Sequence, residues 1–269
     1  MTIWIALLLG VVQGLCEFLP VSSSGHLLLL QNLAGIREDQ GGAFFTVMLH
    51  VATLISVCIV YRKTILKVLK QPFQKLVLHL IIATLPTVCI ALVFKLIEPF
   101  KTFYDRANEG AYLGVCFLMT TALLLFSDYL SARQEKKRPM KAMTNRDALI
   151  VGCMQAVGVL PGISRSGSTI TGAMFASLNK KAAADFSFLM SIPAILGGAV
   201  LEVKDAVEAG SIGVSLPCLL IGMLAAGVTG YFAVNWMLKI IKHKKLWPFA
   251  LYTAVLGIAV ILMQAFGVL

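Results

Sequence analysis

The sequence predicts an all-α polytopic membrane protein, with six transmembrane helices and two re-entrant helix–loop–helix hairpins in inverted-topology repeats. The first observation is composition: of 269 residues, 58% are hydrophobic and 13% are charged, and the mean hydropathy is +0.86. Soluble domains carry about 25% charged residues, so most of this surface must face lipid. The other observations are six long apolar runs and two apolar segments interrupted by Pro, Ser and Gly. A cytosolic enzyme, a disordered chain and a secreted disulfide scaffold are excluded.

The first segment, residues 2–35, is predicted to form a re-entrant hairpin. It is apolar, but Pro20–Gly25 interrupts it with one Pro, three Ser and one Gly. Irregular backbone is costly against lipid, and it is tolerated at membrane depth where protein buries it or where it lines a cavity. The alternative is that the first arm, residues 2–19, crosses the bilayer by itself, since such a helix is about 27 Å long.

Six uninterrupted apolar runs follow, and each is long enough for a transmembrane helix of roughly 20 residues. A second interrupted segment, residues 148–178, lies between the third and fourth runs and is broken at Pro161–Gly167 in the same way. We expect it to form the second re-entrant hairpin. The six predicted spans are 43–60, 76–97, 111–130, 184–203, 213–238 and 247–268.

Charge predicts which side of the membrane each loop faces. Of the 23 Lys and Arg residues, 17 lie in four segments, 62–75, 133–146, 180–181 and 239–245. An excess of Lys and Arg in short loops marks the cytoplasmic side, so the net charge of +10 needs no nucleic-acid partner. The other loops mix bases with acids, as in residues 37–39, and we assign them to the outside.

These sides make the two halves of a single domain, 1–269, inverted repeats of about 1–130 and 147–269. The first hairpin enters from outside and the second from inside, and three crossings in each half invert the second half. A shift of 142 residues places Gln13-Gly14-Leu15 on Gln155-Ala156-Val157, and Val21–His26 on Ile163–Ser168. The alternative is a chance similarity between two turns rich in Gly and Ser.

The interrupted segments hold polar side chains that are expensive inside a membrane and are therefore functional candidates. Gln13 and Glu17 are four residues apart and share one helix face. A guanidinium at membrane depth, that of Arg165, needs an anion, and its fork of donors suits phosphate. The N-termini of helices that begin at the two breaks would add free N–H groups. The predicted phosphate-binding residues are Ser22, Ser24, Gly25, Ser164, Ser166, Gly167 and Thr169.

Blander interpretations stay open for several of these residues. Glu17 can be a structural acid that pairs with Arg165 across the hairpins. His26 can cap a helix rather than act as a general acid or base, and the serines of the first break can be N-caps. His50 and His79, isolated in apolar helices, and His243, in a basic loop, are not expected at the site.

The segments Glu17–His26 (EFLPVSSSGH) and Pro161–Thr169 (PGISRSGST) closely resemble the two signatures of the undecaprenyl-pyrophosphate phosphatase (bacitracin-resistance) family of bacteria. The similarity covers essentially the whole chain, including Phe186–Leu189 and Pro193. It implies a bacterial plasma-membrane enzyme that hydrolyses undecaprenyl diphosphate to undecaprenyl phosphate, so that the lipid carrier of cell-wall synthesis is recycled. It also implies inverted repeats with two re-entrant hairpins and an active site that opens toward the outer face.

The resemblance further implies a set of site residues. The family's acidic motif falls on Gln13 and Glu17, its Ser and His on Ser23 and His26, and its arginine motif on Ser164, Arg165 and Thr169. Members are similar in using magnesium or calcium, which here would lie at Glu17 and Gln13. The first acidic position is often Glu in the family, so the neutral Gln13 leaves a metal more dependent on Glu17 and on the substrate phosphates.

We therefore predict phosphoryl transfer, with Glu17, Ser23, His26 and Arg165 as catalytic residues. Either Ser23 attacks with His26 as base, or water attacks and His26 protonates the leaving oxygen; the sequence leaves both open. The rival function is a polyprenyl-phosphate transporter or flippase, because transporters also use inverted repeats with broken helices. The expected partners are undecaprenyl diphosphate and the bilayer, and a homo-oligomer is left open.

Overall fold

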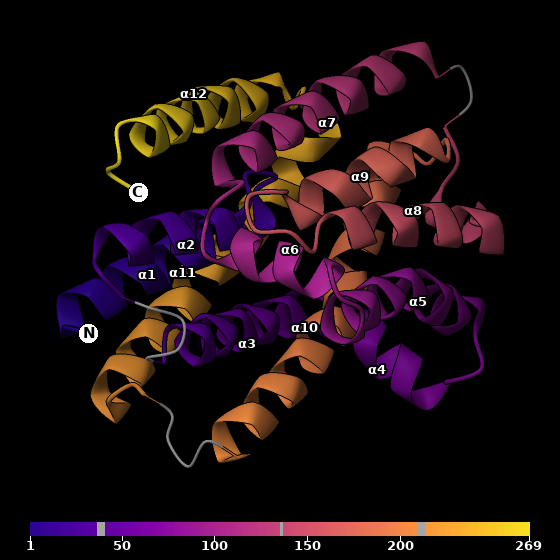
Figure 1. Cartoon of the computed structure of the whole chain (residues 1–269). Coiled ribbons are helices and arrows are strands. Elements are labelled where there is room, and N and C mark those ends of the chain that lie inside the picture. The colour runs from indigo at the N-terminus through magenta and orange to yellow at the C-terminus, as the bar shows by residue number, and fades with distance from the viewer. Residues whose placement is uncertain (37–40, 135–136, 209–212) are drawn as a thin grey trace.

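The computed structural model describes residues 1–36, 41–134, 137–208 and 213–269, and the chain there is almost entirely helical (Figure 1). The helices in order are α1 Ile3–Phe18, α2 Ser23–Leu33, α3 Gly42–Val60, α4 Arg62–Lys70, α5 Lys75–Leu96, α6 Phe100–Asn108, α7 Leu113–Arg133, α8 Asn145–Val157, α9 Arg165–Phe175, α10 Lys180–Glu208, α11 Leu216–His243 and α12 Trp247–Ala265. Within these ranges the extended structure is one isolated bridge, between Arg138 and Leu178. The prediction of an all-α protein is confirmed.

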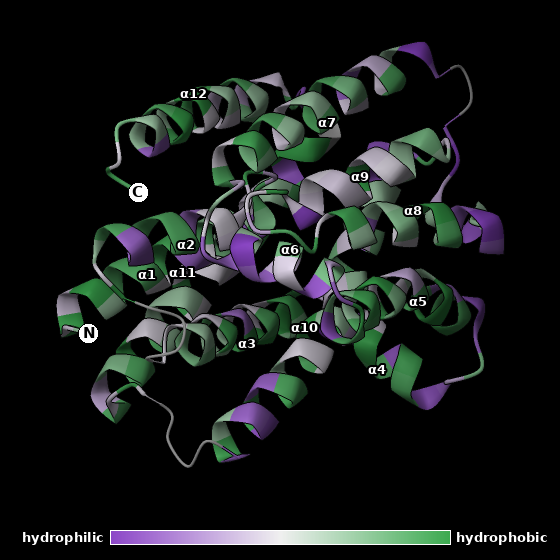
Figure 2. Ribbon diagram, viewed as in Figure 1, coloured by the Kyte–Doolittle hydropathy of each residue, from purple (hydrophilic) through white to green (hydrophobic). Residues whose placement is uncertain are grey.

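Six helices are long and apolar enough to cross a membrane, namely α3, α5, α7, α10, α11 and α12. They coincide with the six predicted spans, so the prediction of a multi-pass membrane protein is confirmed. Both α10 and α11 extend beyond their predicted ends, into polar residues. Figure 2 shows apolar helices whose hydrophilic residues gather toward the ends. The short helices α4 and α6 were not predicted, because their charged residues were interpreted as loops.

Each interrupted segment forms two short helices joined by a loop, as predicted. The arms α1, α2, α8 and α9 contain 16, 11, 13 and 11 residues. At 1.5 Å per residue even α1 is about 24 Å long, which is shorter than the hydrocarbon core of a bilayer, about 30 Å. Each arm is therefore shorter than the hydrocarbon core that a crossing helix spans.

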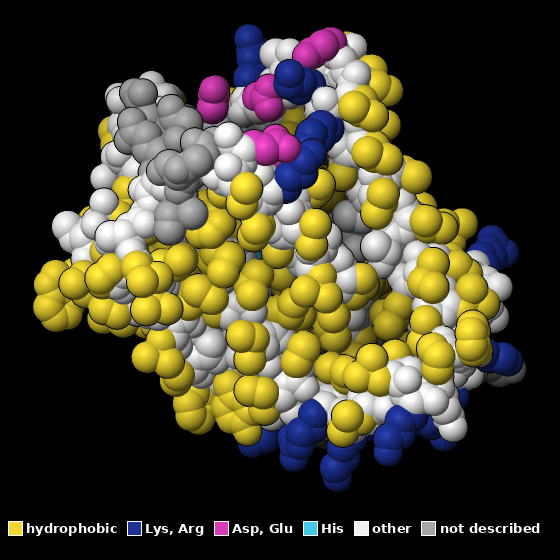
Figure 3. All heavy atoms as spheres, turned by 90° about the horizontal axis from the view of Figure 1, so that it is seen from below, with side chains coloured by type: hydrophobic (Ala, Val, Ile, Leu, Met, Phe, Trp, Pro, Cys, Tyr) yellow, Lys and Arg dark blue, Asp and Glu magenta, His cyan; other side chains and the backbone are white. Residues whose placement is uncertain are grey.

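The four basic segments lie together at one edge of the molecule. The Arg138 carbonyl accepts from Asn179 N at 2.8 Å, Lys180 Nζ donates to the Lys244 carbonyl at 2.8 Å, and one cavity joins α4 to Lys141. Figure 3 shows Lys and Arg along the lower edge, mixed Asp, Glu, Lys and Arg at the upper edge, and a hydrophobic band between them. The charge pattern thus divides the described chain as predicted, although residues 37–39 lie outside the described residues.

Both ends of each hairpin lie close together, and the two hairpins open at different edges. Thr2, before α1, and Ala34, after α2, line one small cavity. On the basic edge, Arg138 Nη2 donates to the Asp147 carboxylate at the start of α8 and to the carbonyl of Ala176 after α9. Each hairpin therefore returns to the edge from which it starts.

The hairpins are packed against helices from the other half of the chain. Helix α1 packs along α11, and α8 packs along α5. Both contacts are close enough to require glycine: a Cβ at Gly10 would collide with the Gly222 carbonyl, and one at Gly152 with the Ala83 carbonyl. The loops of the hairpins then meet, since a Cβ at Gly25 would lie 2.8 Å from Gly162 Cα. This contact positions the site.

Candidate active site

Two helix N-termini, of α2 and α9, begin at the meeting loops with matching caps. Ser22 caps α2 by accepting from Gly25 N at 3.3 Å, and Ser164 caps α9 by accepting from Gly167 N at 3.0 Å. The serine hydroxyls two residues later lie 3.4 and 3.3 Å from these caps. The interpretation left open for the serines of the first break, that they cap a helix, holds for Ser22, and the remaining N–H groups of each first turn are suited to binding an anion.

The backbone of the loops is held from both sides. Ser22 has φ 69°, a left-handed conformation that is uncommon for a residue other than glycine. On the other loop, Thr120 Oγ1 of α7 donates to the Gly162 carbonyl at 2.9 Å and accepts from Ser164 N at 2.9 Å. Such a strained residue persists where its surroundings fix it, commonly at functional sites.

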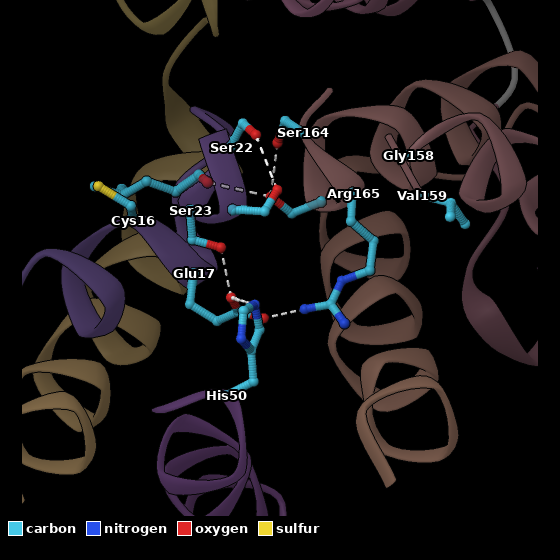
Figure 4. Close-up of a pocket in the computed structure, with 12 residues that line it drawn as sticks. Cys16, Glu17, Ser22, Ser23, His50, Gly158, Val159, Ser164 and Arg165 are labelled. Carbon is cyan, nitrogen blue, oxygen red and sulfur yellow. Dashed lines mark hydrogen bonds and ion pairs between the residues drawn. The ribbon is translucent and has the colours of Figure 1, made fainter. Parts of the chain in front are cut away.

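Glu17, at the C-terminal end of α1, is surrounded by hydrogen-bond donors (Figure 4). Its carboxylate accepts from Ser23 Oγ at 2.7 Å and from Gln13 Nε2 at 2.8 Å. The Arg165 guanidinium of α9 forms an ion pair with Glu17 Oε1. His50 Nε2 of α3 lies 3.4 Å from Oε2, the oxygen that also accepts from Ser23 and Gln13. The predicted pairing of Glu17 with Arg165 across the hairpins is confirmed.

A cavity of about 170 Å³ is lined by Glu17, Ser23, His50 and Arg165, among other residues. It is smaller than pockets for drug-sized ligands, which begin near about 300 Å³, so it suits a small polar headgroup. Ten of the lining residues form five pairs related by the 142-residue shift: Cys16 and Gly158, Glu17 and Val159, Ser22 and Ser164, Ser23 and Arg165, Ser24 and Ser166. The two halves thus contribute equivalent walls, but they place different chemical groups on them.

The predicted site residues separate into two sets. Those on the cavity wall are Glu17, Ser22, Ser23, Ser24, Ser164, Arg165 and Ser166. Behind it lie Gln13, which holds Glu17, and the two glycines whose N–H groups bond to the caps. Thr169 Oγ1 donates to the Arg165 carbonyl at 2.9 Å and lies 2.6 Å from Ser187 Oγ, so it steadies the first turn of α9.

His26 points away from the cavity wall. Its Nδ1 lies 2.6 Å from the Ser22 carbonyl and its Nε2 lies 2.7 Å from the Tyr252 hydroxyl. A carbonyl accepts only, so Nδ1 carries the proton, and Nε2 of the neutral ring accepts from the tyrosine. The ring also packs edge-on against Phe117. In this structure His26 supports the strained Ser22 turn, and its predicted acid–base role stays a prediction.

His50 lies in the cavity, although the sequence analysis placed it outside the site. Its Nδ1 donates to the Thr46 carbonyl, 2.8 Å away, so Nε2 faces Glu17. The residue type was itself a signal, because an ionisable side chain in a membrane span is a functional candidate by default. His50 lies in the continuous span 43–60, where no break in the apolar sequence sets it apart.

The side chains of the site fit a metal ion that binds together with the substrate phosphates better than a metal ion that the protein coordinates by itself. Across the described ranges, no three His, Cys, Asp or Glu side chains are grouped to hold a metal. The Glu17 carboxylate already accepts from Arg165, Ser23 and Gln13. Gln13 Oε1, however, is buried without a hydrogen-bond partner in the described chain. A magnesium ion needs only one or two protein oxygens when phosphates supply others.

Comparison with known proteins agrees with the motifs. The family model "Bacitracin resistance protein BacA" matches residues 6–259. The chain is 44% identical over 266 residues to "Undecaprenyl-diphosphatase" of Carboxydothermus hydrogenoformans, covering 97% of both chains. It is 44% identical over 282 residues to the protein of the same name from Alkaliphilus metalliredigens, covering 98% of this chain and 99% of that one. For the Bacteroides thetaiotaomicron relative, identity is 41% over 271 residues, covering 96% and 98%.

Proposed function

The chain belongs to the bacitracin resistance protein BacA family, and from this membership we propose that it hydrolyses undecaprenyl diphosphate to undecaprenyl phosphate and inorganic phosphate. It is a membrane-embedded phosphatase that regenerates the lipid carrier of cell-wall synthesis. The observation that carries the proposal beyond the family name is the cavity in which Arg165 and two helix N-termini converge beside Ser23. Transport is not favoured, because relatives that match over almost the full length are named for hydrolysis.

The diphosphate headgroup would bind between the two loops. Free N–H groups in the first turns of α2 and α9 would donate to its oxygens, and the Arg165 guanidinium has donors beyond the one that contacts Glu17. These groups offset the charge on the terminal phosphate, which is the largest catalytic contribution in phosphoryl transfer. Because the cavity has room for a headgroup alone, the prenyl chain would extend into lipid.

The hydrogen bond from Ser23 to Glu17 supports Ser23 as nucleophile and Glu17 as its base. Ser23 Oγ would attack the terminal phosphorus as its proton passes to Glu17, and the anhydride P–O bond would break to release undecaprenyl phosphate. Water would then hydrolyse the phosphoserine to free phosphate. In the alternative, Ser23 only positions a water that attacks directly. In either route His50 is the histidine nearest to the reacting groups.

We propose Glu17 and Gln13 Oε1 as the protein's contacts to a magnesium or calcium ion. When bound, the ion would neutralise part of the diphosphate charge. The Arg165 guanidinium, which contacts Glu17, would neutralise a further part of that charge.

The arrangement of the chain in the membrane is part of the proposal. The hairpin arms are shorter than the hydrocarbon core, and both ends of each hairpin lie at the same edge of the molecule. Both observations support two re-entrant hairpins. The five residue pairs in the cavity and the matched caps support inverted repeats with a common axis through the site. With the basic edge cytoplasmic, the protein would lie in the bacterial plasma membrane and its site would open toward the outside.

Phosphate release from undecaprenyl diphosphate by the purified chain in detergent tests the function. Hydrolysis needs one compartment and transport needs two, so release in detergent supports the enzyme and its absence refutes it. Added chelator should abolish turnover. Trapping of phosphate on Ser23, together with loss of turnover in Ser23→Ala, would support covalent catalysis; full turnover by Ser23→Ala would establish attack by water.

A further inference from the structure

A second polar cavity, of about 530 Å³, lies on the basic edge and shares no lining residue with the active site. Its walls are α4, the first turns of α5 and the short 3₁₀ turn Met140–Ala142. Four lysines line it: Lys63, Lys67, Lys75 and Lys141. The mechanism proposed above uses none of them.

The cavity concentrates positive charge that nearby acids do not neutralise. None of its lining residues is acidic, and within the described chain none of the four lysines forms an ion pair. Asp147, the acid whose charge acts on the buried lining residue His79, is already bonded to Arg138 and Thr144. An anion is therefore the ligand that this charge favours.

The cavity also offers a buried neutral donor. Gln74 Nε2 is inaccessible to solvent and has no hydrogen-bond partner in the described part of the chain. A buried donor without a partner costs free energy, which a ligand oxygen would recover. Gln74 caps α5 and has no side-chain cap bond of its own. The Gln74 amide, the lysines and the cavity volume thus point independently to an oxygen-rich anion.

Helix α4, which forms one wall of the cavity, carries both apolar and basic side chains. Leu66 and Leu69 are exposed on α4 and alternate with basic side chains such as Arg62 and Lys70, and the exposed Phe73 follows the end of the helix. A short helix with an apolar face and a basic face lies in the plane of the headgroups, with its apolar side chains in the acyl region. A ligand at this depth comes from the bilayer itself.

We propose that this cavity binds the phosphate-bearing headgroup of an anionic phospholipid, of the phosphatidylglycerol class. Basic pockets between transmembrane helices at the cytoplasmic interface are typical sites for such headgroups. The phosphodiester would lie among the four lysines and accept from Gln74 Nε2. The acyl chains would lie against the exposed apolar residues of α4. The site is independent of the proposed hydrolysis.

Native mass spectrometry of the full chain in detergent tests the proposal, with dioleoyl phosphatidylglycerol, dioleoyl phosphatidylcholine or sodium phosphate added separately. We expect retention of phosphatidylglycerol over phosphatidylcholine. The variant Lys63→Gln/Lys67→Gln/Lys75→Gln should bind phosphatidylglycerol at least about tenfold more weakly, since each basic group near a membrane surface contributes appreciably to anionic lipid binding. The control Lys137→Gln/Lys244→Gln/Lys245→Gln removes the same charge from the same edge, outside the cavity, and should retain the lipid.

Two results would overturn the site. Equal losses in both triple variants would mean a diffuse surface attraction, and displacement of the lipid by sodium phosphate at matched concentration would identify free phosphate as the ligand. If the pocket variant does not fold, acetylation of the wild-type chain gives the same answer. In phosphatidylglycerol nanodiscs, the four cavity lysines should react more slowly than in phosphatidylcholine nanodiscs, relative to Lys137 and Lys244. Equal protection of both groups of lysines would refute the proposal.

Discussion

At the scale of single residues, the site depends on how a carboxylate is kept charged at membrane depth. Glu17 is almost fully buried, and burying an unpaired charge is very costly. Arg165, Ser23 and Gln13 together offset that cost by directing donors at its oxygens. The same contacts would serve the proposed reaction, because they orient the carboxylate toward the Ser23 hydroxyl proton. Removing either charged partner leaves the other buried alone.

Arg165 should not be replaceable by lysine. Arg165→Ala should lower kcat/KM for undecaprenyl diphosphate by at least about 10²-fold, as loss of a transition-state donor does elsewhere. Arg165→Lys should recover little of this, because an ammonium lacks the planar fork that can contact Glu17 and phosphate together. Phosphate release, with the melting temperature measured in parallel, checks the prediction. Arg146→Ala, an exposed site on the basic edge, is the control; near-normal turnover by Arg165→Lys would contradict the assigned role.

His50 should matter more for the chemistry than its position in the sequence suggests. His50→Ala should lower kcat/KM by at least about 10²-fold and change the pH profile of turnover, since it removes the imidazole beside Glu17. His79→Ala, in the same kind of apolar helix but outside the active site, is the matched control and should retain activity. If His50→Ala turns over normally, the acid–base role returns to His26.

The two histidines also show what the sequence can predict at this scale. The signature residues Glu17, Ser23 and Arg165 were found because they interrupt apolar segments, and the structure brings all three to one cavity. His50 was missed because its role depends on α3 passing beside the end of α1, a tertiary contact with no local spacing. The orientation of His26 depends likewise on Tyr252, which lies 226 residues away.

At the scale of elements, the hairpin arms are held by close helix contacts. Gly10 and Gly152 are 142 residues apart and face carbonyl oxygens of α11 and α5. Nothing in the local sequence distinguishes these glycines, because the need for glycine comes from the partner helix. Helices α4 and α6 were missed for a related reason. Both carry charged and apolar side chains, which suits a helix that lies at the membrane surface, and composition alone does not show which segments lie there.

Adding one methyl group at either glycine should destabilise the fold. A Cβ there would meet a backbone carbonyl that moves only with its helix, so Gly10→Ala and Gly152→Ala should each cost about 1–3 kcal/mol, the usual range for overpacking. The melting temperature in detergent should fall in both. Gly197→Ala in α10 adds the same methyl group where nothing lies within 4 Å, and should be neutral or stabilising. Equal melting temperatures for all three variants would contradict the packing argument.

The start of α8 should respond to acid. Burial by itself would raise the pKa of Asp147, but the hydrogen bonds from Arg138 and Thr144 and the charge of Arg138 hold that pKa below its usual value. A carboxyl with a lower pKa in the folded chain stabilises the fold above its unfolded pKa, and this stabilisation is lost as pH falls through the folded value.

Asp147→Asn should therefore lower the stability by about 1 kcal/mol at pH 7, the cost of a lost helix cap. The difference in melting temperature from wild type should shrink as pH falls below about 4, where the wild-type carboxyl also becomes neutral. Asp105→Asn, on the exposed side of α6, should show no such trend. A difference that stays constant down to pH 3 would show that the carboxylate charge is not what stabilises the start of α8.

At the scale of the whole molecule, the active site combines repetition with divergence. The shift of 142 residues pairs Ser22 with Ser164 as helix caps, which accounts for two similar N-termini facing one headgroup. The same shift pairs Ser23 with Arg165 and Glu17 with Val159, so the serine hydroxyl, the carboxylate and the guanidinium of this group each come from one half only. The helix caps that the two halves share would therefore bind the anion, and the residues in which the halves differ would take part in the reaction. The sequence revealed the repeat in its turns, whereas the common cavity required the structure.

The inverted arrangement that we propose predicts which side of the membrane each loop faces. In a background without the six native cysteines, Thr2→Cys, Ala34→Cys and Glu109→Cys should react with an impermeant maleimide in intact cells, and Lys141→Cys should react only after permeabilisation. Ala34 and Thr2 line one cavity, and Asn32 beside them donates to the Glu109 carbonyl, so these three sites share an edge. Labelling of Thr2→Cys and Ala34→Cys from opposite sides would mean that α1 crosses alone. Labelling of Lys141→Cys from outside would reverse the orientation and place the phosphatase cavity toward the cytoplasm.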